Sequence, residues 1–269
     1  MSIKFGAWMK DVADVAFSRR RYVTEHKSGM VIYEYADELA LRKRLETDKY
    51  FLPFTFQGTN HVVHNGSFYY HASQTSNIIR FQFSTAKYQI IELSKCSHNG
   101  QANSLYPKTQ TYVELAVDRY GLWAVCRVQN SQFIGVTRIS LKTGLILRSW
   151  VVDSIKVGSF ENTFIACGIL YAIESLSAPR SHINFVYDLR CNKQLKAAGD
   201  HYMQWLNYNG VRRRIRESPT ESHLADTAGS SMVAFDDVRK RLLVYEEGGI
   251  LSTVGVRMKC RCGRIGRCS

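Results

Sequence analysis

Residues 112–126 read Tyr-Val-Glu-Leu-Ala-Val-Asp-Arg-Tyr-Gly-Leu-Trp-Ala-Val-Cys. Two short apolar runs, residues 113–117 and 122–128, flank a turn at residues 118–121, and this pattern predicts a tight β-hairpin. Glu114 is the only acid in the first run. On a buried strand, such an acid needs a cation, a metal ion or a hydrogen-bond donor. The alternative is an edge strand on which Glu114 faces solvent.

Strand-like runs also fill most of the remaining chain. Residues 62–64 and 68–70 flank Asn65-Gly66, a pair that favours the two positive φ angles of a type I′ turn. Residues 30–45 begin as an alternating strand and pass into a helix of one or two turns. Further runs recur about every ten residues, which predicts an all-β sandwich, barrel or propeller. At roughly 45 residues per four-stranded blade, 269 residues allow five or six blades.

Composition and charge narrow the class of protein. A hydrophobic content of 45% excludes wholesale disorder, and 12% aromatic residues with only 4 prolines favour strands. The net charge of +13 favours acidic partners such as sulfated glycans, nucleic acid or anionic membranes. No window holds the roughly 18 apolar residues of a membrane span, and residues 1–20 lack the features of a signal peptide.

The cysteines do not form a familiar metal or redox motif. The chain has 7 of them, at Cys96, Cys126, Cys167, Cys191, Cys260, Cys262 and Cys268. No Cys-x-x-Cys pair occurs, so neither a zinc ribbon nor a thioredoxin-type site is expected. Residues 259–269 form a basic, cysteine-rich tail, which is expected to be a flexible thiol-bearing segment or, together with a histidine elsewhere, a metal site.

Five motifs resemble those of the olfactomedin domain and occur in that family's order. Residues 114–118 and 121–123, Glu-Leu-Ala-Val-Asp and Gly-Leu-Trp, are similar to its central motif Asp-Leu-Ala-Val-Asp-Glu-x-Gly-Leu-Trp. The other four lie at residues 5–11 (Phe-Gly-Ala-Trp-Met-Lys-Asp), 52–53 with 58–70, 162–171 (Asn-Thr-Phe-Ile-Ala-Cys-Gly-Ile-Leu-Tyr) and 231–233 (Ser-Met-Val). The resemblance covers nearly the whole chain. It implies a five-bladed β-propeller over residues 1–258, followed by the tail at residues 259–269. It also implies a secreted protein, whose leader would then be missing from this sequence.

The resemblance implies a disulfide at Cys167. In the family, this cysteine pairs with one just before the Gly-Ala-Trp motif, and that upstream cysteine is absent here. Cys167 is therefore expected to be a buried free thiol or to pair with a partner that the chain does not contain.

Olfactomedin propellers typically hold a calcium ion in the central channel, and the resemblance implies where its ligands would lie. They are the carboxylate of Glu114, the amide of Asn162, the carbonyl oxygens of Thr163 and Val233, and a second carboxylate at a position occupied here by Ala234. Asp236 or Asp237 could replace that carboxylate only if the strand shifted its register. One carboxylate binds calcium weakly, so the competing expectation is a water network or a basic side chain paired with Glu114.

The function implied by the resemblance is a non-catalytic extracellular module that binds proteins in cell adhesion, matrix organisation or receptor signalling. One alternative is a propeller hydrolase with Glu114 in the central channel. The chain lacks the Gly-x-Ser-x-Gly, P-loop and His-Glu-x-x-His motifs. His61, His64 and His71 lie in or beside the first hairpin, where histidines more often pack than bind metal.

The other alternative is a polyanion binder. The polar loop at residues 207–230 contains a basic cluster at Arg212, Arg213, Arg214 and Arg216. This cluster could contact sulfated glycans or be a proteolytic cleavage site, and a disordered loop without a role is equally expected. Nucleic acid is not an expected partner, because the arginine clusters lack the interleaved aromatic residues of single-strand binders. Asn65-Gly66-Ser67 is an N-glycosylation sequon.

Overall fold

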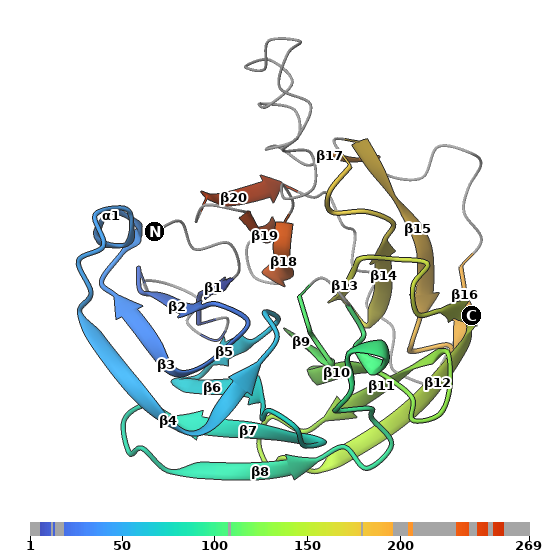
Figure 1. Ribbon diagram of the computed structural model, residues 1–269, viewed down its shortest axis with the longest axis horizontal. Helices are drawn as coiled ribbons and strands as arrows, with labels where there is room; N and C mark the ends of the chain where they lie inside the picture. The colour runs from blue at the N-terminus through green and yellow to red at the C-terminus, as the bar shows by residue number, and fades with distance from the viewer. Residues whose placement is uncertain are drawn as a thin grey trace.

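The computed structural model describes residues 6–11, 13, 19–106, 109–178, 180–195, 204–206, 230–236, 241–246 and 250–255. Within these residues the strands form five antiparallel sheets arranged in a ring (Figure 1). Sheet 1 contains β1 (Gly6–Met9), β2 (Arg21–Glu25), β3 (Ser28–Tyr35) and β4 (Asp48–Gln57). Sheet 2 contains β5 (Val62–His64), β6 (Ser67–His71), β7 (Asn77–Gln82) and β8 (Tyr88–Glu92). Sheet 3 contains β9 (Val113–Asp118), β10 (Gly121–Arg127), β11 (Phe133–Ile139) and β12 (Ile146–Lys156).

The remaining strands complete the ring. Sheet 4 contains β13 (Asn162–Ala166), β14 (Ile169–Ile173), β15 (Arg180–Asp188) and β16 (Lys193–Gln194), and β17 (Gln204–Leu206) also pairs with β15. Sheet 5 contains β18 (Ser230–Asp236), β19 (Arg241–Glu246) and β20 (Ile250–Gly255). The chain is therefore an all-β propeller. Sheets 1 to 4 are complete blades, whereas sheet 5 has three strands in the described residues, so these residues show four complete blades rather than the expected five.

Local sequence signals explain the two predicted hairpins. Asn65 and Gly66 have φ angles of 48° and 65°, as a type I′ turn requires between β5 and β6. Between β9 and β10, Gly121 has a φ of 137°, and a Cβ atom on it would lie 2.7 Å from the carbonyl oxygen of Ile139. Only glycine fits at this turn. Both hairpin predictions are confirmed.

The single helix of the described residues is also at the predicted place. It is α1 (Glu38–Arg42), and the side chain of Asp37 accepts a hydrogen bond from the Ala40 backbone N–H at 2.8 Å, which caps its first turn. A short η1 turn (Gln101–Asn103) follows β8. No helix in the described part of the chain is long and apolar enough to cross a membrane.

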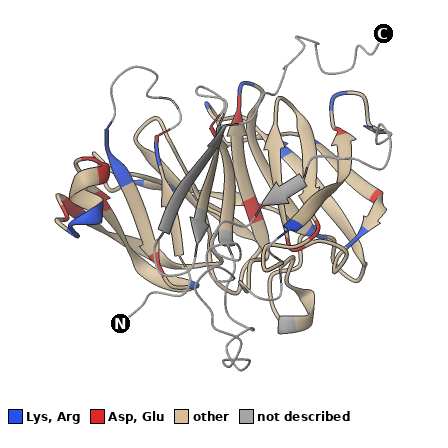
Figure 2. Cartoon of the chain, turned by 90° about the horizontal axis from the view of Figure 1, so that it is seen from above, with Lys and Arg blue, Asp and Glu red and all other residues tan. Residues whose placement is uncertain are grey.

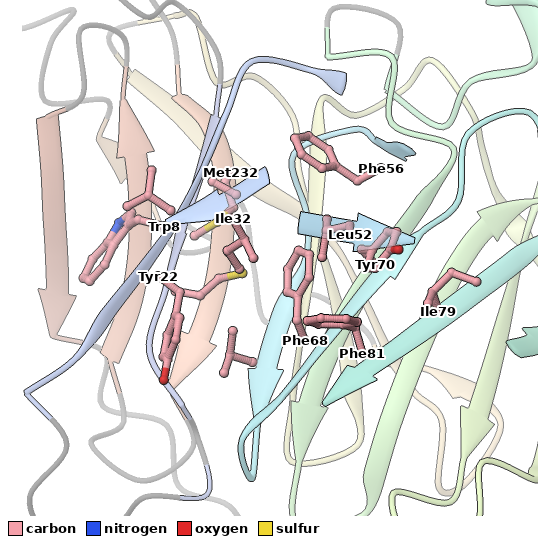
Figure 3. Close-up of a cluster of buried hydrophobic side chains, with 14 of the residues drawn as sticks. Trp8, Tyr22, Ile32, Leu52, Phe56, Phe68, Tyr70, Ile79, Phe81 and Met232 are labelled. Atoms are coloured by element: carbon pink, nitrogen blue, oxygen red, sulfur yellow. The ribbon is translucent and has the colours of Figure 1, made fainter. Parts of the chain in front are cut away.

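Apolar side chains fill the spaces between neighbouring sheets. One cluster joins sheets 1, 2 and 5, and Figure 3 shows Trp8, Phe68 and Met232 from these three sheets among its members. The indole Nε1 of Trp8 donates a hydrogen bond to the carbonyl oxygen of Val244 at 3.2 Å. The first and last sheets are thus tied together, which closes the ring around its axis.

The inner strands β1, β5, β9, β13 and β18 surround this axis (Figure 1). Every residue of β9 is buried, and Glu114 is 1% exposed. The alternative in which Glu114 faces solvent on an edge strand is therefore wrong, because β9 lies between β5 and β13 and not at the rim. The tail at residues 259–269 and the loop at residues 207–229 lie outside the described residues.

Candidate functional site

The polar groups at the propeller axis centre on Glu114. The Leu115 backbone N–H donates to the carbonyl oxygen of Asn60 at 3.2 Å, which places the segment before β5 against β9. The Nδ2 of Asn60 then donates a hydrogen bond to Oε2 of Glu114. Thr59 Oγ1 donates to Oδ1 of Asn60 at 2.9 Å and so fixes the orientation of the amide. Glu114 therefore has a donor supplied by the segment that leads into sheet 2.

Tyr106 supplies the second donor. It lies in the segment between β8 and β9, and its hydroxyl group is hydrogen-bonded to the carboxyl group of Glu114. The same hydroxyl lies 2.5 Å from Oγ1 of Thr163 on β13. Tyr106 and Thr163 are 1% and 0% exposed. The phenol thus connects sheet 3 to sheet 4 through two hydrogen bonds away from solvent.

The segment that carries Tyr106 is held in place by Thr111. The backbone N–H groups of Leu105 and Tyr106 both donate to the carbonyl oxygen of Thr111, at 2.8 and 3.1 Å. The Thr111 hydroxyl lies 2.8 Å from the Thr109 hydroxyl and accepts from the Thr59 backbone N–H at 3.3 Å. The same threonine therefore fixes Tyr106 and the segment that carries Asn60.

Burial controls the protonation of this site. Removal from water raises the pKa of Glu114 well above its usual value, and the hydrogen bonds from Tyr106 and Asn60 oppose this shift. Burial and the nearby Glu114 carboxylate raise the pKa of Tyr106. Among the described residues, no Lys or Arg side chain pairs with Glu114. The expected ion pair with a basic side chain is therefore absent from this part of the chain.

The remaining residues of the implied calcium set lie on β13 and β18. Asn162 is fully buried, and neither its Nδ2 nor its Oδ1 atom has a hydrogen-bond partner among the described residues. Val233 is also fully buried. Ala234 is half-buried and packs against the cluster that joins sheets 1, 2 and 5.

These residues do not fit a calcium ion. Calcium takes six to eight oxygen ligands and usually more than one carboxylate. Glu114 is the sole carboxylate of the set, and two hydrogen-bond donors already engage it. Asp236 lies two residues beyond Ala234, or about 6.6 Å along the strand. Within the described residues, no group of three or more His, Cys, Asp and Glu side chains could hold a metal ion.

The histidines near the first hairpin have packing positions. The ring of His61 lies 5.2 Å from that of Phe56 and 5.5 Å from that of Phe68. The Nε2 of His71 lies 2.6 Å from the carbonyl oxygen of Thr75. Burial lowers the pKa of His61 to about 3 and that of His71 to about 4. Both rings are therefore neutral at physiological pH.

The other predicted residues lie away from the axis. Asn65 is exposed, and its backbone N–H donates to Asp11 at 2.8 Å, so its side chain is accessible at the turn. Cys167 is disulfide-bonded, as is Cys191, so the expectation of a buried free thiol at Cys167 is wrong. A further disulfide, which the sequence did not predict, joins Cys96 to Cys126. The basic cluster at Arg212, Arg213, Arg214 and Arg216 lies outside the described residues.

Sequence reasoning missed Asn60 and Tyr106 as members of the site. Asn60 belongs to a motif that supported only the family resemblance. Tyr106 lies in a segment without strand periodicity, and its partner Thr163 is 57 positions further along the chain. The sequence contained one signal for these residues, which was an acid among apolar residues on an inner strand. A buried acid requires hydrogen-bond donors, but the sequence pattern did not identify the residues that supply them.

A ring of antiparallel sheets around an axis at which buried polar side chains are hydrogen-bonded to one another defines a β-propeller. The family model for the olfactomedin-like domain matches residues 1–224. The chain therefore belongs to the olfactomedin-like domain family.

The sequence identity between this chain and individual relatives is low. Myocilin from Bos taurus is 26% identical over 249 residues, which cover 89% of this chain and 49% of the bovine protein. Myocilin from Felis catus is 28% identical over 242 residues, or 87% of this chain and 48% of the feline protein. The chain thus spans about half the length of the curated relatives it matches. Among solved structures, Kuenenia stuttgartiensis hydrazine synthase aligns over 96% of this chain and 97% of that chain. The TM-score is 0.47 and the sequence identity is 10%, so this similarity supports no conclusion about the fold or the function.

Proposed function

We propose that this chain is a non-catalytic, extracellular protein-interaction module that acts in cell adhesion, matrix organisation or receptor signalling. Membership of the olfactomedin-like domain family supports an interaction module. The disulfide between Cys96 and Cys126 supports an oxidising compartment, because such bonds are rare in reducing ones. The scaffold is rigid, and contacts with partners would come from its outer surface.

The observation that carries this proposal is an apolar surface on the outer strands. Five large apolar side chains on β4, β8 and β12 are between 37% and 49% exposed; they are Phe54, Tyr88, Ile90, Ile146 and Leu147, and we call them the rim patch. These strands lie on the outer side of the ring (Figure 1). Exposed apolar surface of this kind marks protein-binding sites in soluble proteins.

Contacts join the outer strands of neighbouring blades. The rings of Phe54 and Tyr88 meet edge to face at 5.3 Å, which joins β4 to β8. The Nε2 of Gln89 donates to the carbonyl oxygen of Thr143 at 2.9 Å, which joins β8 to the turn before β12. A groove between the segment after β8 and strand β12 is lined by apolar side chains such as Leu93 and Ile146 and by polar ones such as Lys95. The outer strands that carry the rim patch are therefore neighbours across three blades.

The proposal is tested by binding to cells. The labelled chain is added at increasing concentration to intact cultured cells and to the matrix they deposit, and bound label is measured. We expect saturable binding that Ile90→Ser with Ile146→Ser weakens at least about tenfold, because hot-spot side chains each contribute 1 kcal/mol or more. The control is Leu39→Ser, since Leu39 is 59% exposed but lies on α1. Binding that is absent, or that the double variant leaves unchanged, would contradict the proposal.

The two alternative functions have less support. A hydrolase would need substrate to reach Glu114, which is 1% exposed and engaged by Asn60 and Tyr106. For a polyanion binder, Figure 2 shows the Lys and Arg residues of the described part spread around the ring and not gathered on one face. Contact between sulfated glycans and the arginine cluster at residues 212–216 stays a prediction, and heparin retention of Arg-to-Ser variants would test it.

Two structural predictions belong with this function. We infer that sheet 5 is the fifth blade, because β18 packs beside β13 and β1, and Trp8 of β1 is hydrogen-bonded to Val244 of β19. We also propose that Asn65 is glycosylated, because it is exposed at a turn within a sequon. The division into a domain at residues 1–258 and a tail at residues 259–269 stays a prediction.

A further inference from the structure

We propose that Asn60, Tyr106, Glu114 and Thr163 form a metal-independent tie between sheets 2, 3 and 4 at the propeller axis, and that calcium does not stabilise this protein. The hydroxyl group of Tyr106 performs the bridging role that the sequence motifs would assign to a cation. This inference goes beyond the interaction function and does not depend on it.

The first reason is that the carboxyl group of Glu114 already accepts hydrogen bonds. A cation at the axis would have to be held by the lone pairs of the Glu114 carboxyl group. Asn60 Nδ2 and the Tyr106 hydroxyl direct hydrogen atoms at this group. These two bonds take up about half of the roughly four lone-pair positions on the carboxyl oxygens, so a cation would have to share Glu114 with both donors and would bind it less strongly. The donors and a metal ion therefore compete for Glu114.

The second reason is that several contacts hold Tyr106 in place. Its backbone N–H and that of Leu105 are both bonded to the Thr111 carbonyl oxygen, and its ring packs edge to face on Phe160, with the centroids 6.0 Å apart. The hydroxyl is also bonded to Thr163. Contacts on three sides therefore hold the phenol in place. Displacing it would also leave the Thr163 hydroxyl without this partner in a buried place.

The third reason is the balance of charge at the propeller axis. A divalent cation in a dry interior needs compensating carboxylates. Ala234 supplies none, and Glu114 alone provides at most one negative charge. A neutral set of O–H and N–H groups can satisfy Glu114 without burying a net positive charge. The Asn162 amide, which has no hydrogen-bond partner within the described residues, is neutral and adds no compensating charge.

Thermal unfolding of the full chain in excess calcium and in chelator tests the proposal. We expect the midpoint of the wild-type protein to agree within about 1 °C in the two conditions. A ligand at a hundred times its dissociation constant would instead raise it by roughly 5 to 10 °C. Such a rise would overturn the proposal.

Variants separate the hydrogen-bonded tie from other contributions to stability. Tyr106→Phe should lower the midpoint by roughly 3 to 8 °C, equally with calcium and with chelator. Tyr187→Phe is the matched control, because it removes a hydroxyl bonded to Asn192 at 3.1 Å outside the axis, and it should cost less. Glu114→Gln keeps one acceptor oxygen for Asn60, and its Nε2 can donate to the Tyr106 hydroxyl, which can in turn donate to Thr163. This variant should therefore retain the wild-type indifference to calcium and a midpoint above that of Tyr106→Phe. A Tyr106→Phe midpoint no lower than that of the control, or a Glu114→Gln midpoint as low as that of Tyr106→Phe, would contradict the tie.

Discussion

Single buried residues in this propeller differ in how they respond to pH. His61 and His71 are 2% and 0% exposed, and burial is the main cause that lowers the pKa of each ring. Neither imidazole is exposed to the solvent that would stabilise its charged form. His61 lies between Phe56 of sheet 1 and Phe68 of sheet 2, and His71 lies beside Tyr112. Protonation of either ring should therefore destabilise the folded protein.

The response of His61 can be measured. Its pKa is about 3 in the folded protein and about 6.5 in the unfolded chain, so the unfolded chain binds the proton first as the pH falls. The free energy of unfolding should thus fall by about 1.4 kcal/mol per pH unit from this group between about pH 6 and pH 4. Urea unfolding of His61→Gln should show a pH slope smaller than that of the wild-type protein by this amount.

Two comparisons make this prediction specific. The raised pKa of Glu114 gives a slope of the opposite sign, but it contributes to both proteins, so the difference in slope isolates His61. The control is His26→Asn, because His26 is exposed and has a positive φ of 68° that Asn tolerates. A His61→Gln slope equal to that of the wild-type protein would show that the buried ring is already protonated.

Carboxylates connect the elements of neighbouring blades. Asp118, at the end of β9, accepts hydrogen bonds from the Tyr120 backbone N–H at 2.8 Å and from the Trp123 indole at 2.8 Å. Its second oxygen accepts from the Gly168 backbone N–H at 2.7 Å, in the turn between β13 and β14. This side chain therefore stabilises its own hairpin and fastens sheet 3 to sheet 4.

Loss of the Asp118 carboxylate should lower the stability of the folded protein. Asp118→Ala leaves three donors without their charged acceptor, so we expect the free energy of unfolding to fall by about 3 to 5 kcal/mol. Asp153→Ala is the control, since Asp153 is exposed on β12, and its effect should stay within about 0.5 kcal/mol. Denaturant unfolding of both variants makes the comparison. A cost near that of the control would mean that water replaces the lost acceptor.

The same elements show what the sequence could and could not predict. The β5–β6 and β9–β10 hairpins and α1 follow from turn residues, alternation and a cap within a few positions, and these predictions are confirmed. The role of Asp118 toward Gly168 depends on a pairing 50 positions apart. Tyr106 lies between β8 and β9 without periodicity. Such contacts are set by how the blades pack, and local patterns do not encode them.

At the scale of the whole molecule, the propeller follows from the ordered motifs and from strands that recur along the chain. Trp8 on β1 packs with Met232 and Leu243 of sheet 5, so the two ends of the described chain meet in one apolar cluster (Figure 3). The expectation of five blades is met in part, because sheet 5 has three strands within the described residues. Glu114, Asn162 and Val233 lie on inner strands, whereas the motifs did not indicate that Asn60 and Tyr106 supply the donors to Glu114.

The hydrogen bond between Tyr106 and Thr163 is the most direct link of the proposed tie between sheets 3 and 4. A double-mutant cycle with Tyr106→Phe and Thr163→Val, measured by urea unfolding in chelator, isolates the free energy of this link from the cost of each change alone. We predict a favourable coupling of about 0.5 to 3 kcal/mol. Costs of the two single variants that add to the cost of the double variant within about 0.3 kcal/mol would contradict a hydrogen-bonded axis.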